Sequence, residues 1–193
     1  MSASPRRLVA AGLRRLAFAW WLGRGRARQL WWRLLYPGIR FGRRVILDPS
    51  AILAAHDGGT ITIGDDCEIG ARATLIAEGG AIAIGARGHL GIGAVVIARQ
   101  GIAIGADALL SQYVAIRDHD HGTAGEGPYR LQPQVVAPVR IGRNVWLGTK
   151  ATVVKGVAIG DDCVVGANAV VTRDLPAGQL AIGAPARAIR PVR

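Results

Sequence analysis

Residues 141–171 read IGRNVWLGTKATVVKGVAIGDDCVVGANAVV, and in this stretch a branched aliphatic residue returns at every sixth position. The members of the series are Ile141, Leu147, Val153, Ile159, Val165 and Val171. A period of six fits neither the 3.6-residue period of a helix nor the two-residue alternation of a half-buried strand. It fits a parallel β-helix, in which three flat faces of about six residues close one coil. The sequence therefore predicts an all-β solenoid.

The same spacing occurs upstream, as Ile63-Ile69-Leu75, Ile84-Leu90-Val96 and Ile104-Leu110-Ile116. Successive series begin 18 to 21 residues apart, except that 37 residues separate Ile104 from Ile141. About one coil's worth of extra residues therefore lies just after Ile116, and we expect a loop excursion around residues 117–137. It begins with Arg-Asp-His-Asp-His-Gly, the richest cluster of proton-transfer side chains in the chain. Long excursions from a regular scaffold are usually functional or disordered.

The amino-terminal end differs in composition from the rest of the chain. The formal net charge is +11, and residues 1–47 contain eleven Arg and no Asp or Glu. Four of the five Trp also lie there: Trp20, Trp21, Trp31 and Trp32. We expect residues 1–40 to form a basic, Trp/Arg-rich helical segment and residues 41–193 to form the β-helix domain with its carboxyl-terminal tail.

Two roles remain open for the basic segment. Solenoids need caps at their open ends, and helices with Trp and Arg also lie on anionic membrane surfaces. The apolar run 16–22 is too short to span a bilayer. No nucleic-acid-binding motif accompanies the charge, so nucleic acid is not an expected partner.

The two cysteines occur in matching strings, Ile-Gly-Asp-Asp-Cys, that end at Cys67 and Cys163. Each occupies a small inward position of the repeat, where other coils have Ala or Val. We interpret both as packing residues in a reducing compartment rather than as a disulfide pair or nucleophiles.

Residues 138–190 contain Pro-Val-Arg-Ile-Gly-Arg-Asn-Val-Trp-Leu-Gly early and Ala-Ile-Gly-Ala-Pro-Ala-Arg-Ala-Ile-Arg late. In residue type and order this block resembles the hexapeptide-repeat acyltransferases. The likeness is strongest to the maltose/galactoside O-acetyltransferase branch and its relatives that acetylate O-antigen and exopolysaccharide, and it covers about residues 40–190. It implies a left-handed parallel β-helix that works as a homotrimer, with active sites between subunits. It also implies acetyl-CoA as acyl donor and no metal.

In these enzymes a loop histidine is the general base. Carried over by its distance from the last repeat residue, Ile116, this role falls on His121, and read from the local His-x-His string it falls on His119. Asp118 or Asp120 would hold the imidazole in one tautomer. The chemistry needs such a base, because a sugar hydroxyl is a poor nucleophile at neutral pH and a neutral imidazole can take its proton.

The resemblance also implies a donor site. Trp146 would lie near the pantetheine or acyl end, and the backbone N–H of Thr149 would meet the developing oxyanion. Ala167 and Thr172 would line the pantetheine groove, with Gly148 in the same cofactor-binding set. The guanidinium groups of three arginines would face the CoA phosphates; these are Arg173, Arg187 and Arg190.

The acceptor implied by the resemblance is a sugar hydroxyl, but two acceptor contacts of the galactoside enzymes fall on Gly91 and Arg99. This departure favours a cell-surface polysaccharide or a lipid-linked glycan precursor over a free galactoside. A cytoplasmic protein, peripheral on the inner face of the membrane, is the expected setting.

Two other functions compete with acyl transfer. One is a non-catalytic β-helix scaffold that docks on a membrane or partner. The other is a γ-class carbonic-anhydrase-like zinc enzyme, which would use His119 and His121 with His89 as a distant third ligand.

Overall fold

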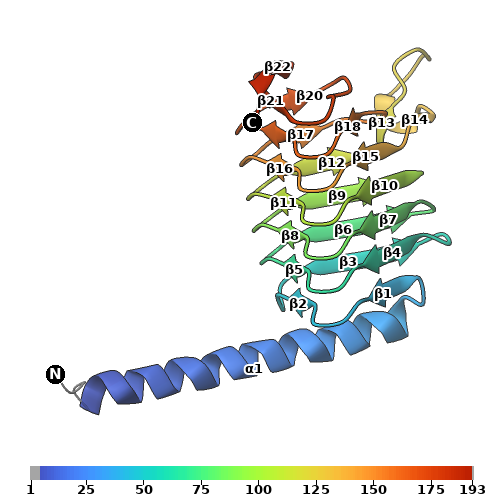
Figure 1. The fold of residues 1–193 in the computed structure, drawn as a ribbon. Coiled ribbons are helices and arrows are strands. Elements are labelled where there is room, and N and C mark those ends of the chain that lie inside the picture. The colour runs from blue at the N-terminus through green and yellow to red at the C-terminus, as the bar shows by residue number, and fades with distance from the viewer. Residues whose placement is uncertain (1–4, 193) are drawn as a thin grey trace.

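The computed structural model describes residues 5–192, which form one long helix followed by a stack of short strands (Figure 1). The helix, α1, spans Pro5–Leu35. Apart from one two-stranded hairpin, the strands after it are wound into three sheets whose members come from successive coils, as a parallel β-helix requires. The predicted solenoid is therefore confirmed.

Each sheet is one face of the solenoid. Sheet A contains β1 (Ile39–Phe41), β4 (Thr60–Ile63), β7 (Ala81–Ile84), β10 (Gly101–Ile104), β15 (Val139–Ile141) and β18 (Ala158–Ile159). Sheet B contains β2 (Ile46–Leu47), β5 (Glu68–Ile69), β8 (His89–Leu90), β11 (Leu109–Leu110), β16 (Trp146–Leu147), β19 (Val164–Val165), β21 (Gln179–Ile182) and β22 (Arg187–Pro191). Sheet C contains β3 (Ile52–His56), β6 (Thr74–Glu78), β9 (Val95–Ala98), β12 (Ala115–Arg117), β17 (Thr152–Val153) and β20 (Val170–Val171).

The six-residue series forms the core. Its aliphatic side chains are buried, and equivalent members of neighbouring coils stack in register, as Ile63 does on Ile84. Ile104 pairs directly with Ile141 although 37 residues separate them. The extra residues therefore leave the solenoid without disturbing its register. Cys67 and Cys163 are free, buried thiols in this core, and burial raises the pKa of Cys67.

The excursion predicted after Ile116 is a hairpin beside the coils. β13 (His119–His121) pairs antiparallel with β14 (Gln134–Val136), and the connection between them contains the short 3₁₀ helix η1 (Tyr129–Leu131). In Figure 1 this hairpin lies on the side of the solenoid opposite β16 and β11. It leaves the corner where sheet C gives way to sheet A, because it follows β12 and precedes β15.

The carboxyl-terminal part of α1 covers the first coil. Gly25 is buried so closely against that coil that an added Cβ would lie 2.3 Å from the carbonyl oxygen of Leu47. Gln29 Nε2 donates to the carbonyl of Val45 at 2.9 Å, and Trp32 packs on the hydrophobic core. A helix of 31 residues is about 46 Å long, and its amino-terminal part extends beyond the coils (Figure 1). Within residues 5–192, no helical stretch combines the length and the apolar composition that are needed to cross a bilayer.

Candidate functional site

Asp118 is a buried carboxylate at the corner between sheets C and A. Its side chain is 0% exposed, and its oxygens accept three backbone hydrogen bonds from the coil below. The donors are Arg99 N at 2.8 Å, Gln100 N at 2.8 Å and Gly101 N at 2.7 Å. Burial opposes ionisation, but these N–H groups and the His119 ring outweigh it and hold the pKa of Asp118 below its ordinary value.

His119 lies against this carboxylate. Its Nδ1 is 3.0 Å from Asp118 Oδ1, and the residue is only 8% exposed. An ionised carboxylate can only accept, so Nδ1 carries the proton in this pair and Nε2 keeps the lone pair. The arrangement orients the ring and leaves one nitrogen able to take a proton, which is the geometry of a general base and its positioning residue.

His121 occupies a different environment on the same strand. It lies two residues beyond His119, so both side chains project to the same face of β13. His121 is exposed, and it stands opposite Gln134 in the hairpin. Asp120 projects to the other face, where it pairs with Lys155 Nζ at 2.5 Å. Of the two carboxylates considered for orienting a ring, the structure brings Asp118, and not Asp120, to a histidine nitrogen.

Other charged residues line the same corner. Arg99, whose backbone N–H binds Asp118, forms an ion pair with Glu78 one coil further down. Thr172 and Arg173 follow β20 at this corner on the last coil and are exposed. Two of the residues predicted for the donor site therefore lie on the histidine side of the solenoid.

The other predicted donor residues lie on sheet B and on the corner between sheets B and C. The Trp146 side chain is 48% exposed, and its Nε1 donates to Ser111 Oγ at 3.0 Å. Thr149 Oγ1 donates to Gln112 Oε1 at 3.1 Å. At Gly148 a Cβ would lie 2.7 Å from the backbone nitrogen of Ala167 on the next coil. Only glycine therefore lets these two coils approach so closely.

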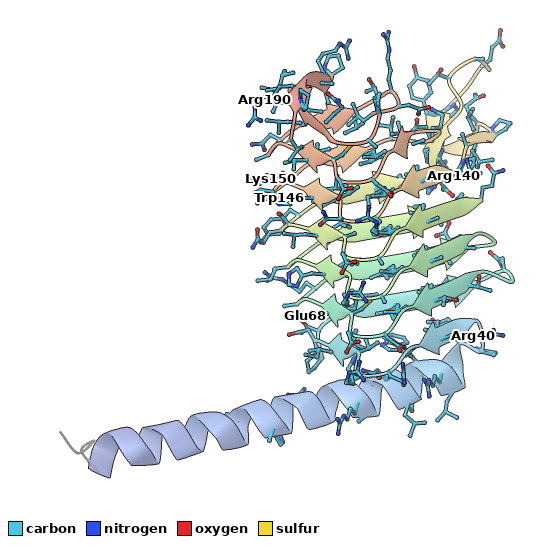
Figure 2. All side chains as sticks on the ribbon, viewed as in Figure 1. Arg40, Glu68, Arg140, Trp146, Lys150 and Arg190 are labelled. Atoms are coloured by element: carbon cyan, nitrogen blue, oxygen red, sulfur yellow. The ribbon has the colours of Figure 1, made fainter. Side chains whose placement is uncertain are left out.

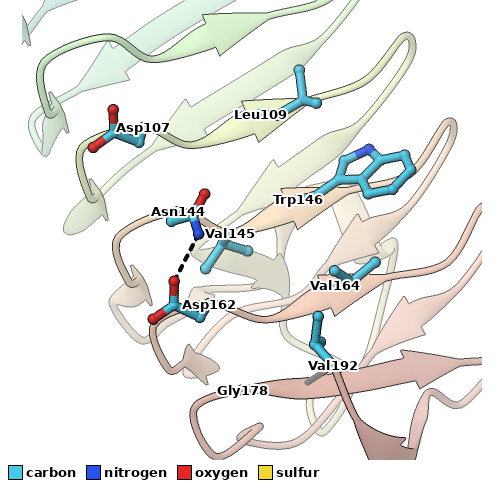
Figure 3. Close-up of a pocket in the computed structure, with 9 residues that line it drawn as sticks. All are labelled: Asp107, Leu109, Asn144, Val145, Trp146, Asp162, Val164, Gly178 and Val192. Atoms are coloured by element: carbon cyan, nitrogen blue, oxygen red, sulfur yellow. Dashed lines mark hydrogen bonds between the residues drawn. The ribbon is translucent and has the colours of Figure 1, made fainter.

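A groove runs over sheet B beside Trp146 (Figure 3). Its floor is apolar, and its rim is polar where the Asn144 amide donates to Asp162 at 2.7 Å. The lining residues are Asp107, Leu109, Asn144, Val145, Trp146, Asp162, Val164, Gly178 and Val192. Arg187 and Arg190 are exposed on β22, which forms the last edge of sheet B. Figure 2 shows Trp146, Lys150 and Arg190 on one side of the solenoid.

The histidine corner and the Trp146 groove are separated within one chain. Gln112, which contacts Thr149, precedes His119 by seven residues that run along sheet C. At about 3.3 Å per residue the two sets are roughly 20 Å apart. Within one chain the two sets of residues therefore lie on opposite edges of sheet C and do not meet.

The three histidines of the zinc alternative lie apart within the chain. Among residues 5–192, no three His, Cys, Asp or Glu side chains are grouped closely enough to hold an ion. His89 lies on sheet B, 3.3 Å from Glu68, whereas His119 stands at the end of sheet C. The three histidines of the zinc alternative are therefore not brought together within one chain.

Sequence reasoning missed several partners of these residues. The backbone donors at Arg99, Gln100 and Gly101 come from a turn 17 to 19 residues before Asp118, and backbone groups leave no signature in the sequence. The sequence also does not indicate the contact between Lys155 and Asp120. Lysine is rare in this chain, where it occurs only at 150 and 155. The repeat register supplies the one available signal, because it places 99, 118 and 155 at the same corner.

Comparisons with known proteins agree with the architecture. The family model described as the hexapeptide repeat of succinyl-transferase matches residues 60–98 and 138–173. The solved structure of an AntD mutant, an N-acyltransferase from Bacillus cereus in complex with dTDP and coenzyme A, has a TM-score of 0.72 at 22% identity. That alignment covers 82% of this chain and 87% of AntD. The polySia-specific acetyltransferase NeuO has a TM-score of 0.60 at 21% identity, over 80% of this chain and 82% of NeuO.

Curated relatives carry acetyltransferase names. Rv3034c of Mycobacterium tuberculosis, named a probable acetyltransferase, is 34% identical over 140 residues, which are 72% of this chain and 47% of that protein. WbbJ of Escherichia coli, whose name describes lipopolysaccharide biosynthesis O-acetyl transfer, is 35% identical over 47% of this chain and 50% of WbbJ. The chain thus spans about half the length of these relatives. The six coils, the match to the repeat model and these relatives all agree. The chain belongs to the hexapeptide-repeat acyltransferase family.

Proposed function

We propose that this protein is an acetyl-CoA-dependent O-acetyltransferase that acts on a sugar hydroxyl of a cell-surface polysaccharide or a lipid-linked glycan precursor. The observation that carries the proposal is the contact of 3.0 Å between buried Asp118 and His119 at the one large break in the repeat. The acetyltransferase names of Rv3034c and WbbJ support the reaction class, and that of WbbJ supports a glycan acceptor.

We assign the general base to His119 rather than to His121. The spacing from Ile116 favours His121, but the contact with Asp118 and the low exposure of the ring favour His119. In the reaction, the acceptor hydroxyl oxygen attacks the thioester carbonyl carbon while Nε2 of His119 takes the hydroxyl proton. The tetrahedral intermediate then expels the CoA sulfur, which receives that proton from the imidazolium. Asp118 keeps Nδ1 protonated and stabilises the transient positive charge.

The donor is proposed to bind along the groove beside Trp146, with the Thr149 backbone N–H near the thioester oxygen. Gly148 and Ala167 form the close coil contact beneath the pantetheine arm. The phosphates are proposed to meet Arg187 and Arg190, and Thr172 and Arg173 of the neighbouring protomer are available to the same ligand. The roughly 20 Å between the two residue sets is the reason for a second protomer. The base must reach the proton of an acceptor hydroxyl whose oxygen is in contact with the thioester carbon.

A homotrimer satisfies this requirement, since it would set the histidine corner of one chain against the Trp146 groove of the next around a closed ring. Light scattering of the purified protein should therefore give three times the chain mass of 20.2 kDa. A monomer with full activity would contradict the shared site.

The test of the base uses two matched variants, His119→Gln and His121→Gln. Release of free CoA thiol from acetyl-CoA is followed with a thiol reagent, with and without glycan acceptor. We expect His119→Gln to lower kcat by about 10²–10⁴-fold, the usual contribution of a general base, and His121→Gln to lower it by less than tenfold. The reverse order would assign the base to His121. Equal rates for wild type and both variants would exclude a histidine base.

A non-catalytic scaffold is the alternative that the same experiment addresses. It predicts no measurable affinity for acetyl-CoA and no thiol release at any acceptor concentration. Calorimetric titration of acetyl-CoA into the wild-type protein and into Trp146→Ala separates the two functions, because only the enzyme loses affinity when the groove loses its indole.

A further inference from the structure

Helix α1 has an apolar face that points away from the solenoid. Residues 25, 28, 29 and 32 face the first coil, where Gly25 is buried and Gln29 binds Val45. The opposite face follows the three-and-four-residue spacing of a helix and is apolar throughout. Its described members are Trp20, Gly23, Ala27, Leu30, Trp31 and Leu34, all exposed. Trp20 is 65% and Leu34 71% exposed. In the sequence, Val9, Leu13 and Leu16 continue the same spacing.

Arginine flanks this apolar face. Arg24 and Arg26 are exposed on its two sides, and the Arg24 guanidinium lies 4.7 Å from the centre of the Trp20 ring. Arg33 is directed to the first coil instead, where its Nη2 donates to the carbonyl of Phe41 at 3.0 Å. The helix as a whole contains eight Arg and no Asp, Glu or Lys. Tryptophan with flanking arginine is the composition of helices that lie in a membrane interface, where indole sits at headgroup level and guanidinium reaches the phosphates.

We propose that α1 docks the solenoid on an anionic lipid surface, with the face Trp20–Leu34 inserted between the headgroups. The positive charge of the helix favours an anionic lipid surface over a second copy of the helix as the partner of this face. A second copy of the helix would bring eight further arginines with no acidic partner, so pairing of two copies is opposed by like charge. An anionic bilayer supplies both the apolar layer for Leu and Trp and the phosphates for Arg. Each arginine near such a surface strengthens binding about fivefold.

The position of α1 gives this docking a direction. The helix lies across the end of the solenoid (Figure 1), so a membrane beneath it leaves the coils standing away from the surface. Sheet C reaches β12, the strand before His119, three strand spacings above β3. With about 4.8 Å for each spacing and about 10 Å for the helix, the histidine corner stands roughly 25 Å above the surface. A glycan held by a membrane lipid is within that reach; this consequence rests on the proposed function, whereas the docking does not.

The test is co-sedimentation of the full-length protein with vesicles. One set contains phosphatidylcholine with phosphatidylglycerol, the other phosphatidylcholine alone, each at low and high salt. We expect binding to the anionic vesicles, release by salt because the Debye length shortens, and little binding to the neutral ones. Arg24→Gln should weaken binding about fivefold, which corresponds to about 1 kcal/mol.

Leu34→Glu tests the apolar face, with Leu131→Glu as the matched control. Both leucines are highly exposed, at 71% and 65%, and both changes add one negative charge, but Leu131 lies in the hairpin excursion far from α1. Leu34→Glu should weaken vesicle binding by at least about tenfold, because a leucine side chain would no longer be buried among the lipids. Leu131→Glu should weaken it by much less.

Three results would overturn the docking. They are no binding of wild type to anionic vesicles, equal losses for Leu34→Glu and Leu131→Glu, or a change in oligomeric mass on Leu34→Glu without lipid, which would make this face an interface between copies. Thiol release from acetyl-CoA without vesicles is measured in parallel. If vesicle binding is absent but thiol release is retained, only the docking is contradicted. If vesicle binding is present but no acetyl transfer occurs, only the proposed function is contradicted.

Discussion

The tripeptides Arg117-Asp118-His119 and Arg173-Asp174-Leu175 occur at the same corner of the solenoid and have different consequences. Both aspartates accept backbone hydrogen bonds from the coil that precedes them. Asp174 is exposed and binds one N–H, that of Ala158 at 2.8 Å, and the chain then continues into the last coil. Asp118 is buried, binds three N–H groups and holds a histidine. The two turns are alike in this backbone contact, but only at Asp118 is the carboxylate buried and in contact with a histidine.

The largest predicted effect separates these two aspartates. In Asp118→Asn the amide has one acceptor oxygen for three N–H groups and turns donors toward the others. We expect a loss of about 3 kcal/mol in the free energy of unfolding and a fall in kcat of at least about 10²-fold, because Nδ1 of His119 loses its acceptor. Asp174→Asn should cost under about 1 kcal/mol, since its site is solvated. Urea unfolding measures the change in stability, and thiol release measures the change in kcat. Equal losses in the two variants would mean that Asp118 and Asp174 have equivalent roles.

Two glycines, one at the groove edge and one at the hairpin edge, differ in how closely a neighbouring coil approaches them. Gly148→Ala puts a Cβ 2.7 Å from the Ala167 nitrogen, whereas Gly101→Ala meets nothing within 4 Å. We expect Gly148→Ala to lower the free energy of unfolding by about 1–3 kcal/mol and Gly101→Ala to change it by less than about 0.5 kcal/mol. Thermal melts followed by circular dichroism test this, and a Gly148→Ala protein as stable as wild type would show that the coils can separate without cost.

The contribution of the ionised Asp118 carboxylate to the free energy of unfolding should depend on pH. Its pKa is lower folded than unfolded, so its contribution to stability is fully present above the unfolded value of about 3.9 and is lost as pH falls through the folded value. We therefore expect the stability difference between wild type and Asp118→Asn to shrink as pH falls below about 4. A difference that stays constant down to pH 3 would mean that this carboxylate is not ionised in the fold.

The smallest predicted effect concerns the carboxyl-terminal arginines of the groove side. Arg187 and Arg190 are exposed, and their described side-chain hydrogen bonds reach only the carbonyls of neighbouring residues, Ala186 and Pro191. The double variant Arg187→Gln/Arg190→Gln should raise KM for acetyl-CoA by about three- to tenfold with kcat unchanged, as expected for solvated contacts to phosphate. Arg43→Gln, on the first coil, is the matched control and should leave KM as it is. A fall in kcat instead would place these arginines nearer the reacting atoms.

Prediction from the sequence was most complete for the coils. The six-residue period located the buried residues from Ile63 to Val171, because a side chain in a stacked coil meets the equivalent position of its neighbours. It also located the excursion. Because the repeat resumes in register 37 residues after Ile104, the residues in excess of one coil must form a loop outside the solenoid. The identity of the base stayed open, because His119 and His121 have the same residue type and nearly the same position along the chain.

What the sequence determined by itself is the solenoid, its one large interruption and the basic amino-terminal helix, because each is a pattern repeated or concentrated along the chain. Tertiary structure alone decided which carboxylate contacts which histidine and that the histidine corner and the Trp146 groove lie on opposite edges of sheet C. It also decided which face of α1 is covered by the first coil. These outcomes depend on contacts between residues of different coils, and such contacts are set by how the coils stack rather than by any local pattern.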